Sequence, residues 1–317
     1  MEKHSNARGV CRPRHFNKRA LTAIELIAKL RRQGMVVNVD SALPYLQQIG
    51  AFRMKGYWYP WQDKVAKTFK SGACFDDAIR RYEFDRELRR ITASALESIE
   101  IMVRTVFSEV MVQGGGPHWF LKASVFGPAA RGVSLTQRSF LQKIEVEVAR
   151  MQDKAFIAHY KQTYDSPALP PSWVISECLS FGAWSHAYMT LADRACRIGI
   201  CKRFKVEDDH VFASWLHALS VLRNVVAHHG RLLGAQSSVT PKSYRKRGLS
   251  FDGSRSFFVM ACVIHYVCSS IRQGPDWTTE IGALFERYPD LDKYALLGFP
   301  QDWFSQPLWL CGQRRRG

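Results

Sequence analysis

The segment VFASWLHALSVLRNVVAHHGRLL, residues 211–233, contains the residue types that RNA cleavage without a metal requires. Four residues separate Arg223 from His228, and one of them is Asn224. In such a reaction one group takes the proton of the 2′-hydroxyl, and a fixed cation stabilises the charge that develops on the phosphorane. A His can do the first and an Arg the second. The long Arg side chain can reach toward the imidazole, so the two groups could hold one phosphate between them.

An amphipathic helix is expected to position these side chains. Its apolar residues recur at helical spacing and fall on one face: Phe212, Trp215, Leu216, Leu219, Leu222 and Val226. Asn224 and His228 are four residues apart and share a different face. Gly230 follows the two His residues and is expected to end the helix in the left-handed conformation.

Spacing alone does not single out this motif. Two other pairs, Arg8 with His15 and Arg203 with His210, also satisfy a loose rule of Arg, four to six residues, then His. Residues 223–228 differ from them in lying on a strongly amphipathic helix that carries an intervening Asn and a doubled His. The structural alternative is a His that caps the end of the helix and an Arg that only lies on the surface.

The rest of the chain also has helical periodicity. Thr22 and Glu25 form a capping box ahead of an apolar run, and Gly34 is placed to end that helix. Residues 75–111 contain no Gly or Pro and repeat apolar residues every three or four positions, which predicts one long helix or two nearly continuous ones. Residues 138–164 and 173–192 are helix-rich as well. Long alternating runs typical of strands are lacking, so the sequence predicts an all-α fold.

Charge points to a polyanionic partner. The 317 residues include 45 Lys and Arg against 28 Asp and Glu, a formal net charge of +17. A field of this sign attracts nucleic acid or an anionic membrane surface. The longest apolar stretch, residues 257–271, is too short to span a bilayer, so we expect no membrane insertion. The basic N-terminus has no apolar core behind it, which favours a cytoplasmic location, with a mitochondrial presequence as the alternative.

Two basic segments are candidate RNA-binding surfaces. Residues 41–61 interleave aromatic residues with Arg53 and Lys55, and such a pattern can stack bases and hold phosphates. Most of these rings could equally belong to the core. Arg245, Lys246 and Arg247 lie in a basic loop that could also bind phosphates or simply be solvated.

Metal and cofactor sites are not expected. The eight Cys residues form no CxxC pair, so we expect them to be reduced thiols. Cys196, Cys201 and His210 could be drawn as metal ligands, but structural zinc sites usually contain more closely spaced Cys pairs. The sequence also lacks the Walker A, GxGxxG, HExxH and GxSxG motifs.

Several blocks of the sequence resemble a known family. They are QQIGAFRMKGYWYPW, YEFDRELRRITASALESIEIMVRT, LPPSWVISECLSFGAWSHAY, SWLHALSVLRNVVAHH and LLGFPQDWFSQPLW, in that order. Together they resemble the Abi-like (abortive infection, AbiD/AbiF) family, whose members are HEPN-type proteins with an Arg-x4-6-His motif. The resemblance implies one all-helical HEPN-like bundle over residues 21–310, with additional N-terminal and C-terminal helices. Basic tails would then occupy residues 1–20 and 311–317.

The resemblance also implies a function and a partner. It implies a metal-independent endoribonuclease that is used against phage or as the toxin of a toxin–antitoxin pair. Related nucleases build one site from two motifs, which implies a homodimer here. Some members are encoded beside a structured non-coding RNA, in keeping with the net charge of +17.

By the same resemblance, Arg223 would bind the scissile phosphate, Asn224 would orient the substrate or the imidazole, and His228 would transfer the proton. His229 and Glu177 are weaker candidates for support of the site. Glu177 could equally pair with an internal Arg or cap a helix.

One departure and two alternative functions remain open. Relatives more often have Arg-Leu-Trp-Asn where this chain has RLLG at residues 231–234. This difference affects the wall of the site and not the motif itself. A catalytically silent protein that binds structured RNA would keep the fold and the charge without needing His228. A protein-interaction module that blocks a host or phage factor is the other alternative.

Overall fold

The computed structural model describes residues 17–127, 136–272 and 276–310. Within these ranges the regular structure is helical, and the few β-bridges are isolated. The predicted all-α fold is therefore confirmed. None of the described helices combines the length and the apolar character needed to cross a membrane. Most of the predicted N-terminal tail and all of the C-terminal tail lie outside the described residues.

The chain divides into two compact units, residues 1–82 and 83–317. The sequence had predicted one helical bundle over residues 21–310. The division follows the packing, because the buried apolar residues form one cluster within unit 1 and a larger one within unit 2. Helix α4 (Phe75–Gly115) begins in unit 1 and continues into unit 2.

Unit 1 is built from short helices. They are α1 (Ala23–Arg32), α2 (Val39–Tyr45), a π-helical turn (Leu46–Gly50), α3 (Ala51–Trp58), a 3-10 turn (Tyr59–Trp61) and the start of α4. The predicted capping box begins α1: the Thr22 side chain accepts from the Glu25 backbone, and the Glu25 carboxylate accepts from the Thr22 backbone. Gly34 follows α1 with φ of 93°, as predicted for a residue that ends a helix.

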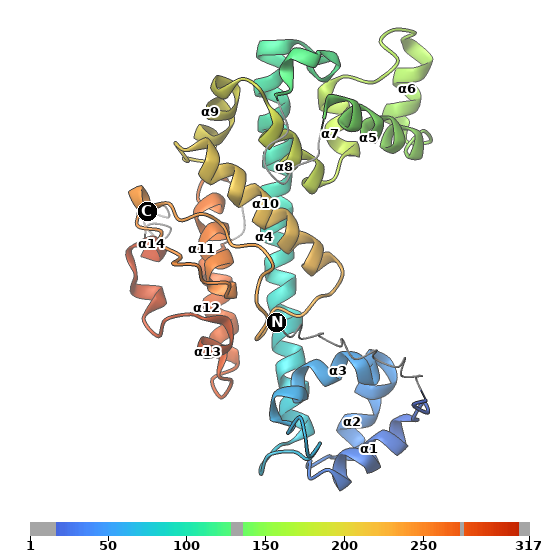
Figure 1. The fold of residues 1–317 in the computed structure, drawn as a ribbon, viewed down its shortest axis with the longest axis vertical. Helices are drawn as coiled ribbons and strands as arrows, with labels where there is room; N and C mark the ends of the chain where they lie inside the picture. The colour runs from blue at the N-terminus through green and yellow to red at the C-terminus, as the bar shows by residue number, and fades with distance from the viewer. Residues whose placement is uncertain (1–16, 128–135, 273–275, 311–317) are drawn as a thin grey trace, which may run out of the picture. The chain divides into compact units, whose positions relative to one another are not determined.

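Unit 2 contains the remainder of α4 and the later helices (Figure 1). They are α5 (Gln137–Arg150), α6 (Ala155–Thr163), α7 (Ser172–Cys178), α8 (Phe181–Thr190), α9 (Arg194–Arg203), α10 (Asp209–Ala227), α11 (Phe257–Cys268), α12 (Trp277–Arg287), α13 (Lys293–Leu297) and α14 (Pro307–Leu310). Short 3-10 turns span Trp119–Leu121, Ala123–Val125, Arg245–Arg247 and Trp303–Ser305.

Helix α10 carries the predicted motif and lies in the middle of unit 2. Its N-cap is Asp208, whose carboxylate accepts from the backbone N–H groups of His210 and Val211. The predicted apolar face is buried: Phe212, Trp215, Leu216, Leu219, Leu222 and Val226. The helix packs against α8, α9 and α11 (Figure 1). The sequence pattern therefore predicted both the helix and its buried face correctly.

A buried carboxylate of α4 fixes the chain just after the motif. Asp85 is fully buried, and its Oδ1 accepts from the backbone N–H groups of Leu232 and Leu233 at 3.0 and 2.7 Å. Its other oxygen pairs with Arg89 one turn later on α4. Backbone N–H groups that would otherwise be buried without partners are thus satisfied by a helix far away in sequence.

Replacing Asp85 by Ala is expected to destabilise unit 2 by roughly 3–5 kcal/mol, because the change removes the acceptor of two buried backbone N–H groups and a buried carboxylate that pairs with Arg89. The midpoint of urea denaturation measures the effect. Glu87→Ala is the matched control on the same helix: Glu87 pairs with Arg90 near the surface, and such a pair contributes about 1 kcal/mol or less. Equal shifts for the two variants would contradict the role given to Asp85.

Candidate functional site

The end of α10 differs in one residue from the sequence prediction. The left-handed conformation belongs to His229, with φ of 57°, and not to Gly230. The His229 N–H donates to the carbonyl of Val226, and the Gly230 N–H donates to the carbonyl of Val225 at 2.7 Å. These two bonds form a Schellman motif with His228 as the C-cap residue. The prediction for Gly230 was therefore wrong by one position.

Gly230 is required for a different reason. A Cβ atom at this position would lie 2.7 Å from Cγ1 of Val225 and 2.9 Å from its carbonyl oxygen. The close approach of the backbone to the last turn of α10 excludes any larger residue without a local shift. His229 then takes the left-handed conformation, which His tolerates better than most residues other than Gly, Asn and Asp.

Arg223 is held by an acidic residue of α4. Its Nε donates to Oε2 of Glu100 at 3.2 Å, and Oε1 of Glu100 accepts from Arg104 at 2.5 Å. The Glu100 side chain is almost completely buried, whereas 37% of the Arg223 side chain is exposed. Arg104 also donates to the carbonyl of Leu179, which links the group to the loop after α7.

This Arg–Glu–Arg group has two cations and one anion, so its formal charge is +1. The Arg223 Nε is occupied, while its two terminal nitrogens have no hydrogen bond to any residue in the described part of the chain. A guanidinium anchored through Nε and open at its other end can donate two parallel bonds to a phosphate. The group is therefore a candidate anion site.

Asn224 and His228 lie on the exposed side of the same helix end. Both residues are exposed, and the backbone N–H of His228 donates to the carbonyl of Asn224. The structure thus presents a partly exposed guanidinium, an exposed amide and an exposed imidazole within six consecutive residues. His229 is exposed as well, but its left-handed backbone sets it apart from the helical face.

Two other His residues of unit 2, His265 and His186, lie in environments that favour the neutral imidazole. His265 is buried, bonds Thr278 and the carbonyl of Leu308, and has its pKa lowered chiefly by burial. Burial also lowers the pKa of His186, and the nearby ring of His217 adds to that effect. These environments favour neutral imidazoles in structural positions rather than groups that meet a substrate.

Glu100 and Arg104 are the residues that sequence reasoning missed. Their spacing of four positions was visible, but a pair of this kind on a long helix is usually a solvated face or an internal brace. Glu177, the acidic residue predicted as a possible support, is exposed and makes no ion pair within residues 17–127, 136–272 and 276–310. The carboxylate that holds Arg223 is Glu100.

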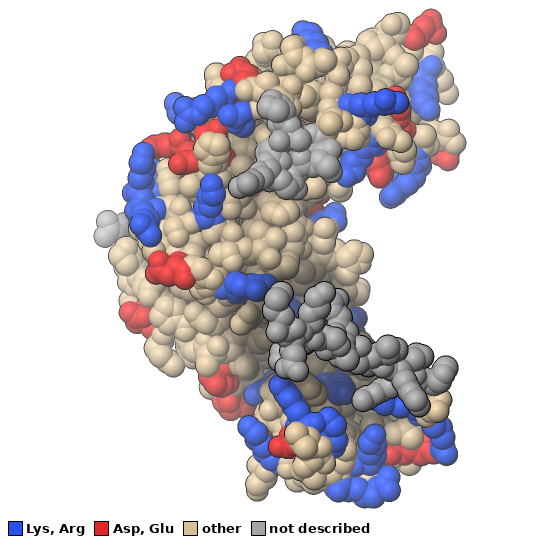
Figure 2. All heavy atoms as spheres, viewed as in Figure 1, with Lys and Arg blue, Asp and Glu red and all other residues tan. Residues whose placement is uncertain are grey.

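Positive charge is concentrated in unit 1. Residues 1–82 contain 16 Lys and Arg against six Asp and Glu, a difference of +10 out of the +17 of the whole chain. Figure 2 shows Lys and Arg side chains over much of this unit, which is the segment coloured blue in Figure 1. About a quarter of the residues therefore carries more than half of the net charge.

The predicted RNA-binding residues of unit 1 lie on its surface. Arg53 and Lys55 of α3 are exposed, and the Lys55 Nζ lies 5.4 Å from the ring centroid of Tyr59. Tyr57 and Trp58 are core residues, whereas the neighbouring Phe52 is 95% exposed. Helix α3 thus presents an exposed aromatic ring next to two exposed cations, a combination that can stack single-stranded bases.

The second predicted RNA-binding segment forms the 3-10 turn Arg245–Arg247 in unit 2. All three residues are exposed. Arg247 donates to Glu207 at 3.1 Å, so its charge is partly compensated. Arg245 and Lys246 have no ion pair with a described residue, which leaves them available for phosphates.

The remaining candidate groups are the Cys thiols and the side chains that could bind a metal ion. Within the described ranges, Cys74, Cys178, Cys196, Cys201, Cys262 and Cys268 are free thiols. Burial raises the pKa of the Cys178 thiol to about 11, which leaves it protonated near neutral pH. No group of three or more His, Cys, Asp or Glu side chains in the described part of the chain is placed to hold a metal ion.

Fold and site together define an all-helical protein with an exposed Arg–Asn–His motif at the end of one helix and a buried carboxylate behind it. The family model described as Abi-like protein matches residues 44–234, which is 191 of the 317 residues. The chain belongs to the Abi-like family, as its resemblance to that family predicted. The matched range contains Glu100, Arg104 and the whole motif. No curated protein and no solved structure matches the chain.

The assignment of the left-handed conformation to His229 can be tested by comparing Ala and Gly at two adjacent positions. At residue 229, Gly is expected to be more stable than Ala by roughly 1 kcal/mol, because Ala pays the cost of a left-handed backbone. At residue 228, where φ is −91°, Ala should be the more stable by roughly 0.5–1 kcal/mol. Thermal denaturation of the four variants measures both differences. The same order at both positions would contradict the assignment.

Proposed function

We propose that this protein is a metal-independent endoribonuclease whose site is built around Arg223, Asn224 and His228. The observation that carries the proposal is the anchoring of Arg223 through Nε to the buried Glu100, beside an exposed amide and imidazole. Catalysis of phosphoryl transfer depends on a fixed cation at the phosphate and a positioned proton acceptor. In this proposal Arg223 is the fixed cation and His228 the proton acceptor.

The proposed reaction begins when His228 takes the proton of a ribose 2′-hydroxyl. The 2′-oxygen then forms a bond to phosphorus, Arg223 donates to the phosphate oxygens, and the bond to the 5′-oxygen breaks. The leaving 5′-oxygen takes up a proton from water or from the His228 of a second copy. The products are a 2′,3′-cyclic phosphate and a 5′-hydroxyl. Asn224 would orient the phosphate or the imidazole.

Membership of the Abi-like family suggests phage defence by abortive infection. A ribonuclease would act in that role by cleaving RNA in the infected cell, or as the toxin of a toxin–antitoxin pair. We propose a two-fold homodimer, because a self-complementary interface would bring two copies of the motif together. Sedimentation without nucleic acid tests this assembly, and a monomer that still cleaves RNA would exclude it.

A second candidate function is a catalytically silent protein that binds a structured RNA. The charge of unit 1 and the exposed Phe52, Arg53 and Lys55 favour RNA binding whether or not the motif is catalytic. The two candidates differ in what they require of His228. Only the nuclease needs its imidazole.

Replacing His228 by Ala is expected to lower the rate of RNA cleavage by about 10²–10⁴-fold and to leave RNA affinity nearly unchanged, because proton transfer belongs to the transition state. Arg223→Ala should lower both. The fold should survive Arg223→Ala, since Glu100 keeps its bond to Arg104. Cleavage of labelled RNA and filter binding on the same preparations measure the two quantities.

His229→Ala is the matched control, because it removes an exposed imidazole from the next position. We expect it to cleave at nearly the parent rate. EDTA should not stop the reaction, since the proposed chemistry uses only an imidazole and a guanidinium. Parent-like cleavage by folded His228→Ala would refute the nuclease and leave the RNA-binding function in its place.

RNA affinity is expected to fall log-linearly with salt concentration, because Lys and Arg that neutralise phosphates release condensed counterions. The double variant Arg53→Ala, Lys55→Ala should reduce the slope of that plot by roughly two, about one for each phosphate that the two side chains neutralise. Arg287→Ala, which removes a single exposed cation of α12, is the control for a loss of charge elsewhere on the surface and should leave the slope unchanged. An affinity that does not depend on salt would rule out this mode of binding.

A further inference from the structure

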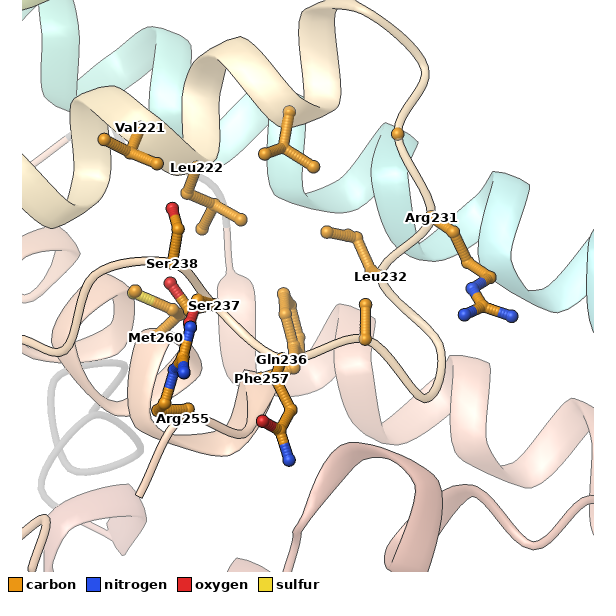
Figure 3. Close-up of a pocket in the computed structure, with 13 residues that line it drawn as sticks. Val221, Leu222, Arg231, Leu232, Gln236, Ser237, Ser238, Arg255, Phe257 and Met260 are labelled. Atoms are coloured by element: carbon orange, nitrogen blue, oxygen red, sulfur yellow. The ribbon is translucent and has the colours of Figure 1, made fainter. Parts of the chain in front are cut away.

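A pocket of about 300 Å³ lies beside the motif in unit 2. Its apolar side is formed by Val221, Leu222 and Val225 of α10 together with Phe257 and Met260 of α11. The segment after the motif, residues 230–238, closes another side. Figure 3 shows Val221 and Leu222 facing Ser237, Ser238 and Met260 across this space. The pocket therefore combines apolar side chains of α10 and α11 with a polar rim that includes Ser237 and Ser238.

Arg255 is the cation of that rim, and its position is fixed. Its Nε donates to the carbonyl of Ser237 at 2.6 Å, and the Ser237 backbone N–H donates to the carbonyl of Arg255 at 2.8 Å. Its terminal nitrogens have no hydrogen bond to a described residue. Ser238 is exposed on the same rim and also has no hydrogen-bond partner in the described ranges. A guanidinium held in this way can donate to the edge of a planar ligand.

Arg231 has a different orientation from the rest of the lining. Figure 3 shows its guanidinium extending away from the other labelled side chains, on the side opposite Ser238 and Arg255. The pocket is thus not a simple cluster of cations around a phosphate. Its chemistry combines an apolar surface with one fixed donor group, which suits a flat ring with a polar edge.

The pocket and the motif share a stretch of chain. Val225 lines the pocket and directly follows Asn224, and Gly230 lines it and directly follows His229. The pocket therefore adjoins the end of α10 that carries Asn224 and His228, while Arg223 is turned toward Glu100 of α4. The volume is at the lower end of the range for small-ligand sites, about 300–1,000 Å³, and matches a single ring system better than a whole nucleotide.

We propose that this pocket holds the base of the nucleotide next to the cleaved phosphate, and that Arg255 selects which base enters. The inference rests on the proposed ribonuclease function and adds sequence preference to it. The apolar walls from α10 and α11 would lie against the faces of the base, while the Arg255 terminal nitrogens bond its edge. A base removed from a stack is recognised in this way, through its edge and its faces.

Base preference at the cut site provides the test. A random-sequence RNA pool is cleaved by the unmodified protein, and the ends of the products are sequenced. We expect one base to be favoured about tenfold at a position adjoining the cut, the size of effect that one good guanidinium–base pair gives. Arg255→Ala and Arg255→Lys should both flatten this preference, because Lys keeps the charge but lacks the two-pronged donor. Arg287→Ala is the charge-matched control and should keep the preference.

Binding provides a second measurement that does not need cleavage. On the His228→Ala background, short RNA oligonucleotides that differ in one base are compared for affinity. Ser238→Phe, which places a ring at the rim of the pocket, should weaken the favoured oligonucleotide to the level of the others. Selective binding that depends on Arg255, without cleavage by the unmodified protein, would refute the nuclease and keep the pocket.

The same experiments can also overturn the pocket assignment while the nuclease stands. Cleavage with an unchanged base profile in both Arg255→Ala and Ser238→Phe would overturn the pocket assignment and leave the nuclease intact. A free nucleoside monophosphate that occupies the pocket more tightly than the oligonucleotide would also overturn it, since the base would then come from a small ligand and not from the substrate.

Discussion

Two buried carboxylates of α4 hold the chain on either side of the motif. Glu100 holds Arg223 just before the end of α10, and Asp85 holds the backbone of Leu232 and Leu233 just after it. The two acids are 15 residues apart, about 22 Å along a helix that rises 1.5 Å per residue. The chain from residue 223 to residue 233 is therefore fixed at both ends to one rigid helix. The exposed side chains of the motif project from this fixed segment.

Because they are buried, these two carboxylates position the chain more than they stabilise the fold. An ion pair in the interior gains little over apolar packing, but the loss of one partner is costly. Asp85 has Arg89 and two backbone N–H groups, so its charge and its lone pairs are compensated. Glu100 has two Arg partners, which leaves the group with a surplus positive charge. That surplus lies at the partly exposed guanidinium, where an anion from solution can reach it.

The periodicity of the sequence predicted the helices well. It could not predict contacts between residues that are far apart in the chain. The capping box at Thr22, the long helix from residue 75 and the buried face of α10 all follow from patterns within a few turns of chain. The bond between Arg223 and Glu100 joins residues 123 positions apart, and no local pattern specifies it. Likewise, the aromatic residues around Arg53 could not be sorted into buried Trp58 and exposed Phe52 without the packing of unit 1.

The left-handed residue at the end of α10 shows why a local rule can miss by one position. Gly is the usual residue for that conformation, so Gly230 was the natural choice over His229. The close approach of the chain to Val225 reserves the Gly for the following position, where any Cβ would collide. His229 then takes the left-handed backbone, while His228 keeps a negative φ of −91° as the C-cap residue. Two identical side chains thereby leave the helix end in different directions, and the same close turn forms one wall of the pocket through Val225 and Gly230. A single steric constraint thus gives the two His residues different backbone conformations and shapes one wall of the pocket.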